Sequence, residues 1–96
     1  MHLGATIKKF RLKKGLTQQE LAEHIGTRIN YISDIETGKR NPGNKLVDQI
    51  AEMFGVNPIF LKFDAMEEED IKREERQLFN SVKPLISDYL DGAMTK

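Results

Sequence analysis

Apolar residues recur every three or four positions along most of this chain, which is the spacing of amphipathic α-helices. The pattern occurs in five stretches before residue 64 and predicts helices over 3–12, 17–25, 28–37, 44–54 and from Pro58 onward. Gly15, Gly26 and Gly55 are predicted to end the first, second and fourth of these helices. The pattern therefore predicts an all-α fold.

Polar residues at the starts of three helices have capping chemistry. In Thr17-Gln18-Gln19-Glu20 the threonine oxygen can accept from the backbone N–H of Glu20, while the glutamate reaches back to the threonine N–H. Asn44 can cap the fourth helix. Asn57 followed by Pro58 is a cap with proline at the first helical position. These signals indicate where the second, fourth and fifth helices begin.

Size and composition limit the class of protein. Ninety-six residues with 39% hydrophobic content suffice for one modest core. The chain has no cysteine, which excludes a disulfide framework and a thiolate metal site. It has no apolar run of signal-peptide length, and none near the roughly 20 apolar residues that cross a bilayer. We therefore expect a cytoplasmic protein with no membrane partner.

Charge is distributed unevenly, although the formal net charge is +0. Residues 1–62 hold ten Lys and Arg against six Asp and Glu, a balance of +4, whereas residues 63–96 hold five against nine, a balance of −4. The composition predicts a basic body, residues 1–63, followed by an acidic tail, residues 64–96. The acidic run at 67–70 would form the first turn of a sixth helix, over about 67–82, since carboxylates suit a helix N-terminus. Pro84 would start another helical turn.

The predicted helix over 28–37 has a buried side and an unusually varied outer side. Ile32 and Ile35 lie within about 60° of each other on a helical wheel and form the buried side. The opposite side carries neither a repeat nor a charge pair, and it consists of Asn30, Ser33, Asp34 and Thr37. Only two or three residues separate this helix from the preceding one. Two helices joined by a tight glycine-bearing turn form the helix-turn-helix arrangement.

The segments LTQQELAEHIGTRINYISDIETGKRNP and LVDQIAEMFGVNPIFL resemble the phage-repressor (Cro/CI, or Xre-like) helix-turn-helix regulators. The resemblance covers roughly residues 3–62. The residues in register with the family pattern are Thr17, Gln18, Glu20, Leu21, Ala22, Gly26, Ile32, Ile35, Glu36, Gly38, Pro42, Ile50, Ala51 and Gly55. The resemblance implies a five-helix repressor-like helix-turn-helix domain, residues 1–63, followed by a C-terminal helical extension that it does not cover.

In that family the second helix of the motif lies in the major groove, so the resemblance implies that the outer face of the helix over 28–37 reads base edges. Asn30 would contact an adenine and Ile29 a thymine methyl. Arg28 would contact a guanine or a phosphate, and Ser33 a base or a phosphate. Asp34 could accept from a cytosine amino group, or be held by an arginine as a specificity filter. The implied base-reading residues are Arg28, Ile29, Asn30, Ser33 and Asp34.

The resemblance also implies phosphate contacts on both flanks of this helix. Gln18 would hold a phosphate through its amide, together with the helix N-terminus. Arg28 stands where the family commonly has a small hydroxyl residue, so Thr27 is expected to cap the helix instead. Glu36 is expected to form a structural ion pair or to cap a neighbouring turn. The implied phosphate-contacting residues are Thr17, Gln18, Thr27, Lys39, Arg40 and Asn41.

Five helices complete the core of that family, so the apolar residues of the tail need another partner. They can fold back onto the body, pair with the same segment of a second chain, or bind a different protein. Operators of this family are usually two-fold symmetric, and a two-fold dimer places two reading helices about one DNA turn, roughly 34 Å, apart. We therefore favour pairing between chains, through Ile71, Leu78, Phe79, Val82, Leu85, Ile86, Tyr89 and Leu90.

Together these features predict a transcriptional regulator that binds double-stranded DNA, in particular a repressor acting as a homodimer on an inverted-repeat operator. The alternative is an antitoxin or other protein-interaction module whose tail binds a regulatory partner protein. An enzyme is not expected, because there is no nucleophile elbow, phosphate-cradling glycine loop or histidine with an acid partner. His2 and His24 lack partners at metal-ligand spacing, and no cofactor is implied.

Overall fold

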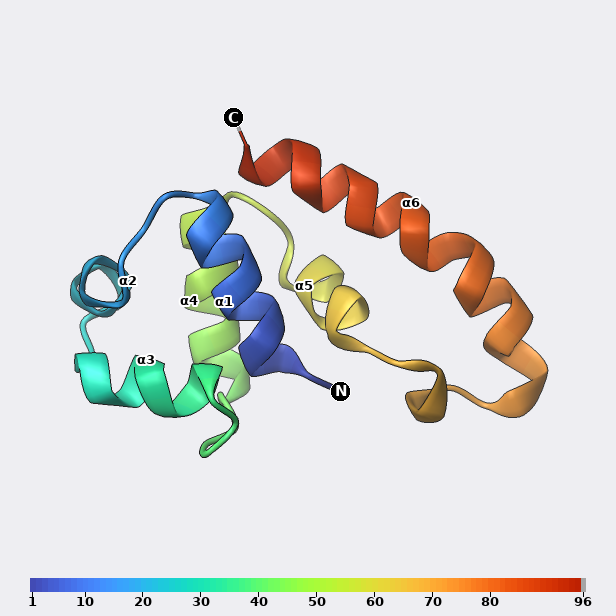
Figure 1. Ribbon diagram of the computed structural model, residues 1–96, viewed down its shortest axis with the longest axis horizontal. Coiled ribbons are helices and arrows are strands. Elements are labelled where there is room, and N and C mark those ends of the chain that lie inside the picture. The colour runs from blue at the N-terminus through green and yellow to red at the C-terminus, as the bar shows by residue number, and fades with distance from the viewer. Residues whose placement is uncertain (96) are drawn as a thin grey trace.

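The computed structural model describes residues 1–95, and the predicted all-α fold is confirmed there, with no β-strand in that range. The helices are α1 (Leu3–Lys13), α2 (Gln18–Ile25), α3 (Ile29–Glu36), α4 (Asn44–Phe54), α5 (Pro58–Ala65) and α6 (Arg76–Met94), with 3₁₀ turns at Glu68–Asp70 and Arg73–Glu75. In Figure 1, α2 and α3 form one end of the molecule, α1 and α4 stand beside them, and α6 runs along the opposite side, beyond α5. None of the helices described is both long and apolar enough to cross a membrane.

The predicted helix starts are confirmed for α2 and α5. Thr17 Oγ1 accepts from the Glu20 N–H and Glu20 Oε1 accepts from the Thr17 N–H, both at 3.0 Å. Asn57 Oδ1 accepts from the Ile59 N–H at 3.0 Å. The prediction that Asn44 caps α4 is wrong. Asn44 is the first helical residue, and Gly43 holds the cap position without a side-chain hydrogen bond.

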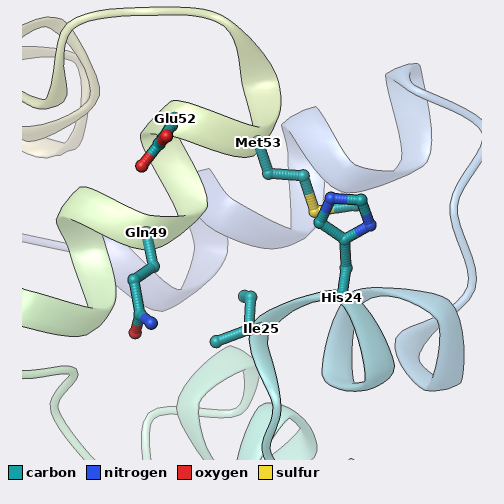
Figure 2. A pocket seen from close by; sticks show the side chains of 5 residues that line it. All are labelled: His24, Ile25, Gln49, Glu52 and Met53. Carbon is teal, nitrogen blue, oxygen red and sulfur yellow. The ribbon is translucent and has the colours of Figure 1, made fainter.

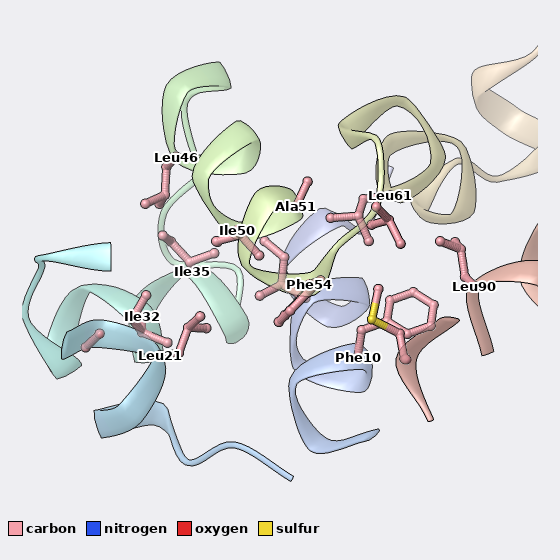
Figure 3. Close-up of a cluster of buried hydrophobic side chains, with 14 residues drawn as sticks. Phe10, Leu21, Ile32, Ile35, Leu46, Ile50, Ala51, Phe54, Leu61 and Leu90 are labelled. Carbon is pink, nitrogen blue, oxygen red and sulfur yellow. The ribbon is translucent and has the colours of Figure 1, made fainter. Parts of the chain in front are cut away.

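One apolar core receives side chains from all six α-helices, as Figure 3 shows. Ile32 and Ile35 of α3 are almost completely buried in it, as the helical wheel predicts. Burying one such side chain stabilises a fold by about 1.5–3 kcal/mol relative to leaving it exposed. The third helix is therefore held on the body by its inner side, which leaves its outer side to the surroundings.

The chain between α5 and α6 differs from the predicted helix over 67–82. The Glu67 N–H donates to Asp70 Oδ2 at 2.8 Å, as expected at a helix start, but only the short 3₁₀ turn Glu68–Asp70 forms there. At Ile71 the backbone is extended, with φ −113° and ψ 140°, and α6 begins only at Arg76. The prediction that Pro84 starts a helix is also wrong, because α6 continues through it. Proline removes one backbone hydrogen bond there, while Phe79 before it and Leu90 after it are buried against the body.

The tail folds back onto the body, which is one of the three partners considered for it. Leu90 and Met94 of α6 are 0% and 1% exposed and belong to the common core. Phe79 is also buried, with its ring centroid 5.3 Å from that of Phe63 in α5. Phe79 and Leu90 are therefore not available at the surface of the chain, and we remove both from the predicted pairing surface.

Ion pairs join the basic body to the acidic tail. Lys9 Nζ lies 2.8 Å from Asp64 Oδ2, and Lys13 pairs with Asp91 of α6. The Asp64 side chain is only 2% exposed and also accepts from Ser87 Oγ at 2.7 Å. Asp64 thereby ties α1, α5 and α6 together. Attraction between the basic body and the acidic tail thus contributes to the docking of the tail.

Candidate nucleic-acid interface

A tight turn sets the positions of α2 and α3. Gly26 has φ 82°, and the N–H groups of Gly26 and Thr27 both donate to the Ala22 carbonyl oxygen at 2.9 Å. A residue with a side chain is disfavoured at this φ, so glycine suits the end of α2. The turn brings α3 directly against α2, and the two helices form a helix-turn-helix unit.

The outer side of α3 is open. Arg28, Ile29 and Asn30 are exposed at its N-terminal end, while Ser33 and Asp34 are partly exposed further along. All five predicted base-reading residues therefore lie at the surface of one short helix and its cap. Ile29 is 39% exposed, so it is neither core nor fully solvated. In Figure 1, α3 lies at the edge of the part of the molecule that the structure describes.

The start of α3 differs from the expectation that Thr27 caps it. Arg28 occupies the cap position with extended φ and ψ of −94° and 148°, and no side chain makes a capping hydrogen bond there. The helix therefore begins at Ile29. Since uncapped N–H groups at a helix start need acceptors, this end of α3 has donors available to an anion.

The loop after α3 turns back and lies beside the helix at Asp34 and Tyr31. The Arg40 N–H donates to the Asp34 carbonyl oxygen at 3.2 Å, and Arg40 Nε lies 3.9 Å from Asp34 Oδ2. The Arg40 guanidinium carbon stands 5.6 Å from the centre of the Tyr31 ring. Lys39 and Asn41 on either side of Arg40 are exposed. Three predicted phosphate-contacting residues therefore lie beside the predicted base-reading face.

A buried polar network supports the other flank. Arg11 Nε and Nη2 donate to the two carboxylate oxygens of Glu36 at 2.6 and 3.0 Å, and Arg11 Nη1 donates to the Leu16 carbonyl oxygen at 2.7 Å. The Glu36 side chain is 1% exposed. The expectation that Glu36 makes a structural ion pair is thus confirmed. Arg11 was not singled out from the sequence, although it comes four positions after the core residue Ile7 on the same helical face.

Gln18 takes part in this network. Its Nε2 donates to Glu36 Oε1 at 3.0 Å, so the amide predicted to hold a phosphate is directed by the C-terminal end of α3. A glutamine amide has two N–H groups, and the second is left for another acceptor. Thr17 is exposed beside it at the N-terminus of α2, and Thr27 is half-buried in the turn. On this flank Gln18 therefore contacts α3 directly and Thr27 lies in the turn that leads into it, whereas Thr17 caps α2.

A separate hollow lies between α2 and α4. Its volume is about 420 Å³, and Figure 2 shows His24 and Ile25 from the end of α2 facing side chains of α4. The residues that line it are His24, Ile25, Gln49, Glu52 and Met53. Across residues 1–95 no group of three or more His, Cys, Asp or Glu side chains is placed to hold a metal ion. The hollow shares no residue with the outer side of α3.

The glycine turn, the exposed outer side of α3 and the cationic loop beside it define a helix-turn-helix DNA-binding protein. A model of the family described as Helix-turn-helix matches residues 7–61, which is more than half of the chain. The chain belongs to this family, in its phage-repressor (Cro/CI, Xre) type, and is a DNA-binding transcriptional regulator.

Similar proteins come from an archaeon and from a phage. An uncharacterized HTH-type transcriptional regulator of Archaeoglobus fulgidus is 46% identical over 63 residues, which are 64% of this chain and 87% of that protein. The ImmF control region 10 kDa protein of Bacillus phage phi105 is 40% identical over 60 residues, 62% of this chain and 67% of that protein. The immunity repressor protein of the same phage is 31% identical over 81 residues, 84% of this chain and 54% of the repressor. No solved structure matches the chain significantly.

Proposed function

We propose that this protein represses transcription by binding an inverted-repeat operator as a homodimer and occluding a promoter. The proposal rests chiefly on the open outer side of α3, where Arg28, Ile29 and Asn30 are exposed while Ile32 and Ile35 anchor the helix in the core. An α-helix fits the width of the major groove, where each base pair presents a distinct pattern of donors, acceptors and methyl groups. The similarity to a phage immunity repressor also supports repression.

Asn30 is the residue that tests base reading. Its amide can bond two atoms of an adenine edge, so Asn30→Ala should weaken binding to the best duplex selected from a random pool by about 1–3 kcal/mol. Binding to random DNA should change little. Asn80→Ala, at an exposed position of α6, is the matched control and should alter neither. Equal weakening of Asn30→Ala on both DNAs would contradict a base-reading role.

Phosphate contacts should make affinity fall with salt. Each cation that neutralises a phosphate releases a counterion, so log K falls linearly with log salt concentration. Gln18, Thr17 and Thr27 would act on one flank of α3, and the loop residues Lys39 and Asn41 on the other. Lys39→Ala should lower the magnitude of the salt slope by about one. An unchanged slope would remove Lys39 from the phosphate contacts.

An exposed apolar stripe on α6 supports pairing with a second copy. Leu78, Leu85 and Tyr89 are 68%, 67% and 52% exposed, and Val82 lies between them. Their spacings of four, three and four residues match the seam of a two-helix coiled coil. Ile71 and Ile86, both partly buried, flank the stripe. A two-fold dimer through this stripe would present two α3 helices to major grooves separated by one DNA turn or a multiple of it.

Sedimentation of Leu85→Glu tests this pairing. The side chain is exposed, so the variant should fold, while a buried unpaired charge at the interface should convert the dimer to a monomer. Leu12→Glu is the matched control, since Leu12 is 58% exposed on α1 and is not a residue of α6. A Leu85→Glu protein that sediments as a dimer would place the interface elsewhere.

The same stripe supports a second candidate function, in which the protein is an antitoxin or other interaction module. A partner protein would then cover Leu78, Leu85 and Tyr89, and the DNA-binding face would act in autoregulation. Purification from its native cells decides between the two. If a second protein co-purifies in stoichiometric amount and is lost from the Leu85→Glu variant, the interaction module is favoured. If the protein purifies as a homodimer with no second protein, the simple repressor is favoured.

A further inference from the structure

Arg40 lies against α3, although it belongs to the loop after that helix. Its backbone N–H is bonded to the Asp34 carbonyl oxygen, its Nε faces Asp34 Oδ2 at 3.9 Å, and its guanidinium lies near the Tyr31 ring at 5.6 Å. These contacts place the Arg40 guanidinium beside α3, although its side chain is 66% exposed, and Lys39 next to it is exposed as well, with no such contact in the part of the chain described. Arg40 therefore occupies a defined place beside the outer side of the helix.

Arg40 and Asn30 share one hollow. A hollow of about 660 Å³ lies along α3 and the turn before it, and its lining includes Arg28, Asn30, Tyr31, Asp34 and Arg40. Asp34 comes four residues after Asn30, so the two side chains are neighbours on the helix surface. A base edge that reaches Asn30 would then have the Arg40 guanidinium within the same groove.

We infer that Arg40 reads a guanine in the major groove and that Asp34 is its positioning residue. The inference rests on the proposed function, in which α3 enters that groove. Arginine is the residue that pairs bidentately with guanine O6 and N7. Because Nε faces Asp34, the two terminal Nη groups remain for the guanine. The Tyr31 ring adds a cation–π contact that limits how the guanidinium can swing.

The pairing also accounts for a carboxylate on a DNA-binding face. An isolated Asp34 would be repelled by phosphates, since like charges across a groove raise the free energy of the complex. Arg40 offsets this charge when both residues enter together. In return, Asp34 draws Arg40 toward α3 and away from the phosphates that an unrestrained loop arginine would contact. With Asp34 beside it, Arg40 therefore contacts a particular base instead of the phosphates, which are the same in every DNA sequence.

Selection from a random duplex pool tests the inference with the full chain. Arg40→Lys keeps the charge but lacks the planar fork, so it should lose the preference for one G·C pair in each half-site by about 5- to 150-fold. The other positions of the selected motif and the salt slope should stay as in the wild type. Lys39→Ala is the control, and it should weaken all duplexes about equally without changing the motif. An Arg40→Lys motif with every preference intact would show a phosphate contact and overturn the inference.

Asp34→Asn tests the positioning role separately. Removal of the carboxylate should reduce discrimination at the same G·C pair and raise affinity for random duplexes, because Arg40 is released toward the phosphates. Loss of preference at a different base pair, with the Arg40-dependent pair intact, would show that Asp34 reads a base itself and would overturn this role. A wild-type chain that selects no motif would overturn the proposed function as well, whereas an intact motif with Arg40→Lys overturns the inference alone.

Discussion

The backbone of Gly4 in α1 lies against the carbonyl oxygen of Ile35 in α3. A Cβ atom at Gly4 would stand 1.9 Å from that oxygen and 3.0 Å from the carbonyl carbon, and real Cβ contacts essentially never fall below 3.0 Å. The obstacle is backbone, which cannot rotate away as a flexible side chain can. The lack of a side chain at Gly4 therefore allows α1 to cross close to the C-terminal end of the proposed reading helix.

Gly4→Ala should destabilise the protein because the two helices must separate or tilt. Inserting one methyl group into a tightly packed contact costs about 1–3 kcal/mol, and measurement by urea denaturation should show a loss in this range. Affinity for the selected duplex should fall as well, since α3 loses its support at Ile35.

Gly92→Ala is the matched control for this substitution. Gly92 is also helical, and apart from its neighbouring residues and the backbone of its own helix nothing lies within 4 Å of where its Cβ would stand. Alanine there should stabilise α6 by roughly 0.5–1 kcal/mol. Equal stability of the two variants would mean that α1 and α3 are not in the close contact described.

The helix-turn-helix unit could be predicted from sequence because local chemistry specifies it. The capping box at Thr17 and Glu20, the positive φ of Gly26 and the burial of Ile32 and Ile35 each depend on a few neighbouring residues. The close approach at Gly4 could not be predicted, because a helical wheel shows which side is buried but not which helix lies across it. For a similar reason, an ion pair of Glu36 was among the expectations but its partner Arg11 was not, because the sequence does not show which residue of α1 faces the end of α3.

In the tail, by contrast, local signals in the sequence did not predict the structure correctly. The acidic run does form the hydrogen bond expected at a helix start, between Glu67 and Asp70, but the length of a helix depends on how its later residues pack. Ile71 lines an apolar hollow with Phe63 and Phe79 instead of continuing a helix, and this packing was not visible in the spacing of apolar residues. Fold-back and pairing also use the same kind of apolar side chain, so the sequence left them open.

Removing one partner of the Arg11–Glu36 pair should be strongly destabilising. The side chains are 7% and 1% exposed, so Glu36→Gln would leave a buried guanidinium without its counter-charge. Breaking such a pair costs about 3–5 kcal/mol. Glu23→Gln is the control at an exposed glutamate that accepts only from Gln19, and it should cost less than about 0.5 kcal/mol. Urea denaturation of both variants measures the difference, and similar small losses would contradict a supporting role for the pair.

Acid should weaken the start of α2 through Glu20. The backbone N–H and the hydroxyl of Thr17 hold the pKa of Glu20 below its ordinary value of 4.5. A carboxyl whose pKa is lowered by folding contributes stability above its unfolded pKa, and this stability is lost as pH falls through the folded value. The melting temperature should therefore begin to fall near pH 4.5, and Glu20→Gln should make that fall smaller. Titration of Glu20 by NMR gives a direct check, and a pKa at or above 4.5 would contradict the capping box.

The turn before α6 should respond to acid in the same direction. The backbone N–H of Glu67 and the N-terminal amine lower the pKa of Asp70 below 3.8. Asp70→Asn should therefore remove a part of the acid sensitivity that begins below about pH 3.8 and is separate from that of Glu20. Melting temperatures of the single and double variants between pH 7 and pH 2 measure the two contributions. Identical acid profiles for wild type and Asp70→Asn would exclude this contribution.

Two leucines of α6 should behave very differently, because one belongs to the core and the other to the surface. Leu90 is 0% exposed and Leu85 is 67% exposed. Leu90→Ala should destabilise the protein by about 2–5 kcal/mol, whereas Leu85→Ala should stay within about 0.5 kcal/mol once denaturation is measured at two protein concentrations to separate any effect of association. For the same reason, deleting the tail would remove core side chains together with the exposed stripe, so a truncated chain that fails to dimerise says little about the interface. Equal stability of the two alanine variants would mean that α6 is not docked on the body as described. The core that supports α3 would then consist of residues from α1 to α5 alone.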